Sequence, residues 1–203
     1  MLHLKEKKER SLGVKLFLKG ERCNSPKCAL TRRPYRPGIH GKRRRVVSEY
    51  GHQLSEKQKI KFSYGLNERQ LRTIFQKALK KPGAIKDFIV KALETRLDST
   101  IFRLGIASSK RIARQMVSHG HILVNGKRVS APSYKVLVGD VICIRPQSKE
   151  MSMFKDLKNS LKNYQVPTWL ALDQEKIEGK ILAFPSEVDS AFDINLVVDY
   201  YSK

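Results

Sequence analysis

Cysteine is scarce in this chain, and long apolar runs are missing. Its three cysteines, Cys23, Cys28 and Cys143, are too few and odd in number for a disulfide scaffold, which favours a reducing compartment. No apolar run approaches the ~20 residues of a membrane-spanning helix. The first ten residues lack the apolar core of a secretory signal, and Glu6 and Glu9 argue against a transit peptide. We therefore expect the protein to stay where it is made, in the cytoplasm or, if it is organelle-encoded, in the matrix or stroma.

Acidic residues are also few. The 203 residues include 41 Lys and Arg against 19 Asp and Glu, a formal net charge of +22. Residues 1–50 hold 15 basic and 4 acidic side chains, residues 51–150 hold 20 and 7, and residues 151–203 hold 6 and 8. Such a field recruits polyanions. Because the single Trp169 lies in the least basic part, an amphipathic membrane-binding helix is disfavoured, and nucleic acid is the expected partner.

Motifs for catalysis are missing as well. The sequence has no Gly-x-Ser-x-Gly, His-Glu-x-x-His or Gly-x-Gly-x-x-Gly pattern. The loop Gly38-Ile-His-Gly-Lys42 has too few residues between its glycines for a phosphate-binding loop, and Arg43 stands where Ser or Thr would bind magnesium. His119 and His121 have no third metal ligand nearby in sequence. We expect no catalytic residue and no metal ligand.

Cys23 and Cys28 form a Cys-x-x-x-x-Cys pair that contains Pro26, a spacing that can present two thiolates to one zinc ion. A closed structural site needs four ligands. No second cysteine pair lies upstream, Cys143 is far away in sequence, and His40 is a conceivable third ligand. On ligand count we expect two unliganded thiols and no cofactor, with zinc at Cys23 and Cys28 as the alternative.

The N-terminal half reads as a basic arm followed by helices. Residues 1–45 are rich in proline, glycine and cations and end in Lys42-Arg-Arg-Arg45, so we expect an arm that becomes ordered by lying on its RNA. From 48 to 102 the periodicity is helical, with a capping-box pattern at Asn67 and Gln70. The first apolar stripe consists of Leu71, Ile74, Phe75, Ala78 and Leu79. A second stripe starts at Ile85 and extends towards Gly105.

A compact α+β unit follows. Residues 109–119 predict a helix capped by Ser108 and ended by Gly120. Asn125-Gly126 between His121-Ile-Leu-Val124 and Lys127-Arg-Val129 is the strongest short hairpin signal. Further strands are expected at 134–138, 141–145, 168–172 and 196–198, and a helix around 154–161.

The stretch Arg96-Leu97-Asp98 raises an enzymatic alternative. Pseudouridine synthases place their catalytic Asp in an Arg-Leu-Asp context, but on a glycine-rich loop of a large sheet domain. Here Asp98 lies within a helical pattern, where pairing with Arg or capping a turn is simpler. A stand-alone RNA-modifying enzyme and a free RNA chaperone remain the alternatives to a non-catalytic RNA-binding protein.

The residues at 105–129, with Ser108-Ser-Lys-Arg-Ile-Ala-Arg114 and Val124-Asn-Gly-Lys-Arg-Val129, together with Val138-Gly-Asp-Val141, resemble the S-four RNA-binding module. The rest of the chain resembles the S-four family of small-subunit ribosomal proteins. The matching segments are Gly13–Cys28, Pro37–Gly41, Glu56–Lys59, Tyr64-Gly65, Glu68–Gln70, Glu94–Asp98, Pro167–Leu170 and Tyr201–Lys203. The resemblance covers nearly the whole chain, in order.

The resemblance implies a fold and a set of partners. The fold is α+β: a basic extended arm at 1–45, an all-helical domain at 46–92 and 186–203, and an inserted RNA-binding domain at 93–185 with its core at about 94–145. The function is to bind a multi-helix junction of small-subunit ribosomal RNA, to nucleate assembly of the subunit body and to influence accuracy. The other partners are the S-five protein and messenger RNA near the channel by which it enters the ribosome, with no membrane and no small-molecule substrate.

The zinc-bearing members of the family have a Cys-x-x-Cys pair before the Gly-Val-Lys-Leu stretch. This chain has Glu6 and Glu9 at the matching positions, so we expect no full zinc site. We expect RNA contacts through A-form shape, phosphates and 2′-hydroxyl groups. The expected RNA-binding residues are Arg32, Arg33, Tyr35, Lys42, Arg43, Arg44, Arg45, Lys110, Arg111, Arg114, His119, Asn125, Lys127 and Arg128.

Overall fold

The protein folds into two compact units. The computed structural model describes residues 5–43, 46–81, 83–155, 157–162, 164–185 and 192–202. The first unit combines Met1–Ile89 with Val188–Lys203, and the second is the continuous segment Val90–Glu187. The sequence predicted borders at 92/93 and 185/186. The first unit is helical and the second carries a small antiparallel sheet, so the predicted α+β class is confirmed.

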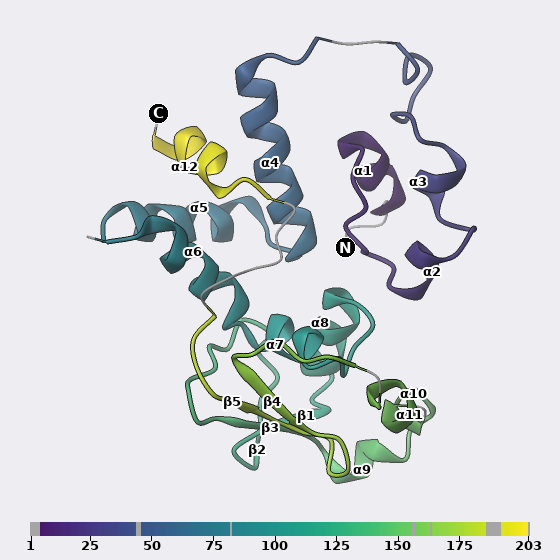
Figure 1. Ribbon diagram of the computed structural model, residues 1–203, viewed down its shortest axis with the longest axis vertical. Coiled ribbons are helices and arrows are strands. Elements are labelled where there is room, and N and C mark those ends of the chain that lie inside the picture. The colour runs from purple at the N-terminus through teal and green to yellow at the C-terminus, as the bar shows by residue number, and fades with distance from the viewer. Residues whose placement is uncertain are drawn as a thin grey trace. The chain divides into compact units, whose positions relative to one another are not determined.

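Three helices build the compact part of the first unit: α4 (Glu49–Ser63), α5 (Glu68–Leu79) and α12 (Ile194–Ser202). A fourth helix, α6 (Ile85–Glu94), contains the border between the units. Helix α5 begins at the predicted capping box, in which Gln70 N–H donates to Asn67 Oδ1 at 2.8 Å and Asn67 N–H donates to Gln70 Oε1 at 3.1 Å. Figure 1 shows α12 beside α4, against which it packs, as it does against α5.

Helix α12 corrects the strand that the sequence predicted at 196–198. The β-branched Val197 and Val198 favour a strand locally. Asp193 instead starts a helix, because its Oδ1 accepts the backbone N–H of Asn195 at 2.9 Å. Ile194 and Val197 are then buried on one face. Packing against α4 and α5 therefore outweighs local strand propensity.

A polar cluster joins α12 to the other two helices. Lys57 Nζ lies 2.8 Å from Glu68 Oε1 and 3.2 Å from the Tyr200 hydroxyl. Lys61 Nζ lies 2.8 Å from Glu68 Oε2, and the Tyr201 hydroxyl donates to Glu68 Oε1 at 3.1 Å. Burial raises the pKa of Glu68, but the hydrogen bonds from Lys57, Lys61 and Tyr201 outweigh it and lower the pKa to about 2. One carboxylate thus ties together three helices.

The segment predicted as an extended arm contains short helices. They are α1 (Lys5–Leu12), α2 (Glu21–Asn24) and α3 (Ala29–Arg32). The buried Glu9 carboxylate accepts the backbone N–H groups of Leu16 at 3.1 Å and Leu18 at 3.2 Å. Among residues 5–43, the buried side chains are those of Glu9, Cys23 and Cys28. This segment therefore folds locally around a carboxylate and two thiols instead of an apolar core.

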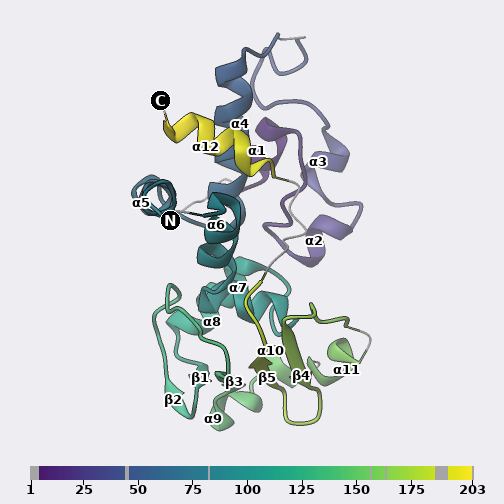
Figure 2. The same cartoon turned by 60° about the vertical axis from the view of Figure 1, so that its left-hand side comes forward.

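The second unit is a five-stranded antiparallel sheet with helices. The strands are β1 (Ile122–Val124), β2 (Lys127–Arg128), β3 (Val141–Ile144), β4 (Leu170–Asp173) and β5 (Glu178–Ile181), in the order β2-β1-β3-β5-β4. Figure 2 shows the β1–β2 hairpin at one edge of the sheet and the β4–β5 hairpin at the other. The helices are α7 (Leu97–Arg103), α8 (Lys110–Ser118), α9 (Pro146–Lys149), α10 (Ser152–Lys155) and α11 (Leu157–Leu161).

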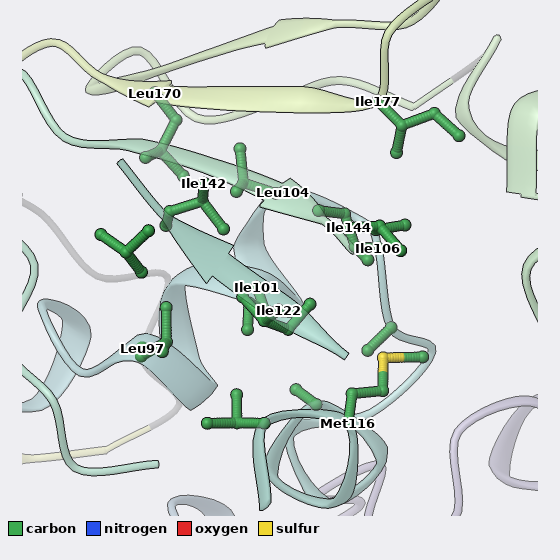
Figure 3. Close-up of a cluster of buried hydrophobic side chains, with 14 of the residues drawn as sticks. Leu97, Ile101, Leu104, Ile106, Met116, Ile122, Ile142, Ile144, Leu170 and Ile177 are labelled. Carbon is green, nitrogen blue, oxygen red and sulfur yellow. The ribbon is translucent and has the colours of Figure 1, made fainter. Parts of the chain in front are cut away.

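The core of this unit lies between one sheet face and the helices α7 and α8. Figure 3 shows Leu97, Ile101 and Leu104 of α7 with Ile122, Ile142, Ile144 and Leu170 of the strands. Gly179 of β5 allows the closest approach, since a Cβ there would fall 2.4 Å from a Leu104 methyl carbon. The absence of a side chain at Gly179 thus lets strand β5 pack closely against Leu104.

Two predictions about this unit were wrong. Residues 134–138 do not form a strand, and their pairing is limited to an isolated bridge between Lys135 and Arg96. The helix predicted from Ile85 towards Gly105 breaks at Thr95 and Arg96, where Arg96 is extended. The break exists because backbone bonds link this point to the 134–136 segment, with Leu97 N–H donating to Tyr134 O at 2.9 Å.

Candidate nucleic-acid interface

Helix α8 presents a polar face with an unpaired cation. The helix starts where Ser109 Oγ accepts the backbone N–H of Ile112, and Gly120, with a φ of 75°, follows its end. Ala113, Met116 and Val117 are buried in the core. Arg111 is exposed, and it makes no hydrogen bond or ion pair with the residues that the structure describes. This guanidinium is therefore available to an anion.

Two predicted cations of the same helix are less available. Lys110 Nζ lies 3.7 Å from the buried carboxylate of Glu94, which also pairs with Arg103 at 3.0 Å. Burial lowers the pKa of Lys110 to about 8, although the charge of Glu94 opposes that shift. Arg114 is half-buried and interacts within the protein. Lys110 and Arg114 therefore already have partners within the protein, their binding to RNA stays a prediction, and Arg111 is the exposed cation of α8.

The β1–β2 hairpin carries two exposed cations on β2 and an asparagine in its turn that hydrogen-bonds within the protein. Lys127 and Arg128 are both exposed on the edge strand β2. Asn125, at a φ of 50°, makes two hydrogen bonds within the protein, since Nδ2 donates to Asp140 Oδ1 at 2.8 Å and Oδ1 accepts from Val141 N–H at 2.9 Å. Asn125 therefore braces the turn, and its role as a hydrogen-bonding partner of RNA stays a prediction.

Arg128 reaches back to the end of α8. Its Nη2 lies 3.5 Å from the carbonyl oxygen of His119, and a Cβ on Gly120 would fall 2.1 Å from its Nε. The His119 ring is exposed, 5.9 Å from that of His121 between ring centroids. Arg145 follows β3 and donates its backbone N–H to His121 O at 2.8 Å. Arg145 was not predicted as a neighbour of this surface, because the pairing register of β1 with β3 brings it there.

The first unit holds a second set of predicted residues. Arg32, Arg33, Lys42 and Arg43 are exposed. Tyr35 is half-buried, and its ring faces two cations, with the Arg10 guanidinium 5.1 Å and Lys42 Nζ 5.3 Å from its centroid. The predicted Arg44 and Arg45 lie outside the described residues.

A hollow beside these cations adds one residue that the sequence reasoning did not name. It is lined by residues 36–41 together with Arg43. Arg36 is exposed at its rim. The loop turns tightly at Gly41, where a Cβ would collide with the Arg36 carbonyl oxygen at 1.8 Å. Arg36 and Arg43 thus extend the basic surface of the first unit.

The residues around Cys23 do not fit a zinc site. Glu9 Oε1 accepts hydrogen bonds from the backbone N–H groups of Leu16 and Leu18. Cys23 Sγ lies 3.9 Å from the same oxygen. Glu6 pairs with Lys19 at 2.7 Å. Burial, followed by the charge of Glu9, raises the pKa of Cys23, which disfavours the thiolate that binds metal. Among the residues described, no three His, Cys, Asp or Glu side chains are arranged to hold a metal ion.

The Arg96-Leu97-Asp98 stretch forms a buried ion pair. Arg96 Nε donates to Asp98 Oδ1 at 3.0 Å, and Nη2 donates to Oδ2 at 2.7 Å. Asp98 Oδ1 also accepts the backbone N–H of Ser99 at 3.0 Å. The Asp98 side chain is only 5% exposed, and its partners lie within the fold. Its geometry is that of a structural brace.

Helices that could cross a membrane were not found in the described part of the chain. Two family profiles match the sequence. Residues 2–94 match the ribosomal protein S4/S9 N-terminal domain, and residues 95–142 match the S4 domain.

Curated relatives match almost end to end. The small ribosomal subunit protein uS4 of Thermus thermophilus is 48% identical over 197 residues, covering 96% of this chain and 94% of the relative. The protein uS4A of Alkaliphilus metalliredigens is 48% identical over 196 residues, and uS4 of Halothermothrix orenii is 45% identical over 196, with the same coverage. The resemblance is confirmed, and so is the expectation that the chain is not an enzyme, because this is a family of structural RNA-binding proteins. The chain belongs to the uS4 family of small ribosomal subunit proteins.

Proposed function

We propose that this protein is a structural constituent of the small ribosomal subunit that binds its ribosomal RNA directly. One observation carries the proposal: Arg111, Lys127 and Arg128 project exposed from a module whose sheet and helices are rigidly packed. Because the core positions the backbone that carries them, these cations can contact phosphates arranged as in one RNA shape. The exposed Arg32, Arg33, Lys42 and Arg43 supply a second contact surface.

The proposal extends to the site and its neighbours. Two basic surfaces on one chain suit a multi-helix junction, whose several backbones present phosphates in different directions. Holding such a junction early would nucleate assembly of the subunit body. The proposed further partners are the S-five protein and messenger RNA near the channel by which it enters the ribosome. Through these contacts the protein would influence decoding accuracy. It would reside on ribosomes in the cytoplasm.

Binding to small-subunit ribosomal RNA is expected to weaken steeply with salt. Each neutralised phosphate releases counterions, so six or more contacts lower the affinity about a thousandfold between about 50 and 200 mM salt. Filter binding across a salt series measures this slope, with an unrelated RNA of equal length as the control. A flat dependence, or equal affinity for both RNAs, contradicts the proposal, as does sedimentation of the cellular protein away from small subunits.

We also propose that the segment around Cys23 and Cys28 is held without metal. Elemental analysis of protein purified without added metal is expected to find far less than one zinc per chain. Glu9→Ala is expected to cost about 1–3 kcal/mol locally, because the Leu16 and Leu18 N–H groups lose their acceptor. Amide hydrogen exchange at these two positions measures the loss, and the exposed Glu21→Ala is the control. Stoichiometric zinc that survives mild chelation contradicts the proposal.

A further inference from the structure

Four basic side chains surround the start of strand β1 in the second unit. His119 ends α8, His121 precedes β1, Arg128 lies on β2 and Arg145 follows β3. The two imidazole rings are 5.9 Å apart between centroids. The Arg128 guanidinium lies against Gly120, between the two histidines in sequence, and the backbone of Arg145 pairs with that of His121 at 2.8 Å. Four neighbouring segments, at α8, β1, β2 and β3, therefore bring basic side chains to one place.

The His121 ring is held in position by its neighbours. Its Nδ1 lies 3.0 Å from Ser148 Oγ on α9, and the ring of Phe154 on α10 packs edge-on at 5.9 Å. His121 is half-buried, whereas His119 and Arg128 are exposed. The ring cannot swing away without losing both contacts, so an anion that reaches the exposed side meets imidazoles already in place.

The charges around His121 are all positive. Burial, and then the charges of His119, Arg128 and Arg145, lower its pKa. None of these four side chains has an ion pair with a carboxylate among the residues that the structure describes. Burial and the neighbouring positive charges therefore favour the neutral form of His121 in the free protein.

We infer that His119, His121, Arg128 and Arg145 form a binding site for an RNA phosphodiester, and that filling this site draws a proton onto His121. The inference rests on the proposed RNA-binding function. It adds to that function a specific phosphate site and the uptake of a proton on binding. The phosphate supplies the missing negative charge, which favours the imidazolium form. The proton comes from the solvent.

The direction of the pH dependence follows from this linkage. The phosphate raises the pKa of His121 in the complex above that in the free protein, so the added affinity is fully present below the free value. It is lost as the pH rises through the value in the complex. A difference of one pKa unit corresponds to a tenfold change in affinity. We expect binding to weaken about tenfold between about pH 6 and pH 8 at constant salt.

Calorimetry on the full-length protein and small-subunit ribosomal RNA tests the inference. Titrations at about pH 7 in two buffers of different ionisation enthalpy count the protons taken up, with about half to one proton expected per complex. His121→Gln, which retains a hydrogen-bonding group for Ser148, and His119→Gln are expected to reduce this uptake and flatten the pH profile. The exposed His52→Gln on α4 is the control, and it is expected to keep the wild-type uptake.

The possible outcomes separate the inference from the function on which it rests. Tight, salt-sensitive RNA binding with no proton uptake overturns the inference and leaves the proposed function standing. Absence of RNA binding overturns the function itself. Uptake that persists in both histidine variants, with thermal unfolding of the variants unchanged, also overturns the inference, because the proton then goes elsewhere.

Discussion

Replacing Asp98 with asparagine is expected to lower the free energy of unfolding of the second unit by about 3–5 kcal/mol. The variant keeps the side-chain shape but leaves the Arg96 guanidinium, 7% exposed, without its countercharge. A buried cation without a partner is far less stable than a buried pair. Trp169 is the only tryptophan of the chain and lies in this core, so denaturant titrations followed by its fluorescence report on this unit.

Two further variants make the Asp98 experiment specific. Glu150→Gln removes one negative charge from an exposed position of the same unit and is expected to change stability by less than about 0.5 kcal/mol. Arg96→Met combined with Asp98→Leu removes both charges, and it is expected to recover part of the loss, since apolar replacements of buried pairs are often tolerated. A stability of Asp98→Asn equal to that of Glu150→Gln would show that the pair contributes nothing.

The double variant Arg111→Ala/Lys127→Ala is expected to weaken binding to small-subunit ribosomal RNA about 10- to 100-fold. Both side chains are exposed on α8 and β2, so each loses a phosphate contact and the salt slope falls by about two. Folding is expected to be unchanged within about 0.5 kcal/mol, because neither side chain packs in the core. Filter binding across a salt series and Trp169 fluorescence measure the two quantities.

A charge-matched control separates a specific surface from general attraction. Lys176→Ala/Lys180→Ala removes the same two charges from exposed positions in and beside β5. It is expected to weaken binding less than threefold, through the long-range field alone. If the two double variants lose affinity equally, α8 and the hairpin are not the contact surface. Normal entry of Arg111→Ala/Lys127→Ala into small subunits in growing cells would contradict the proposed role in assembly.

Features set by neighbours in sequence were predicted well. The capping box at Asn67 and Gln70 depends on residues three apart, and the Asn125-Gly126 turn depends on two adjacent backbones that tolerate positive φ. The apolar stripe of α5 follows from its period alone, and Leu71, Phe75 and Ala78 are buried as expected.

Features set by distant partners were not predicted. Lys110 looks like a surface cation in sequence, and only the fold places Glu94 beside it. Asn125 looks free until the loop before β3 brings Asp140 to its amide. Arg145 joins the histidines because β1 and β3 pair in one register. In each case a polar side chain acquires its role from tertiary contacts that periodicity does not encode.

The cluster that holds α12 against α4 also sets an order of events during synthesis. Lys57 and its partner Tyr200 are 143 positions apart, and the whole second unit lies between them. At about 5–20 residues per second, a translating ribosome delivers Tyr200 roughly 7–30 s after Lys57. Helices α4 and α5 therefore wait for α12 while the whole second unit is translated. The contacts of α12 with α4 and α5 can form only when almost the entire chain has been made.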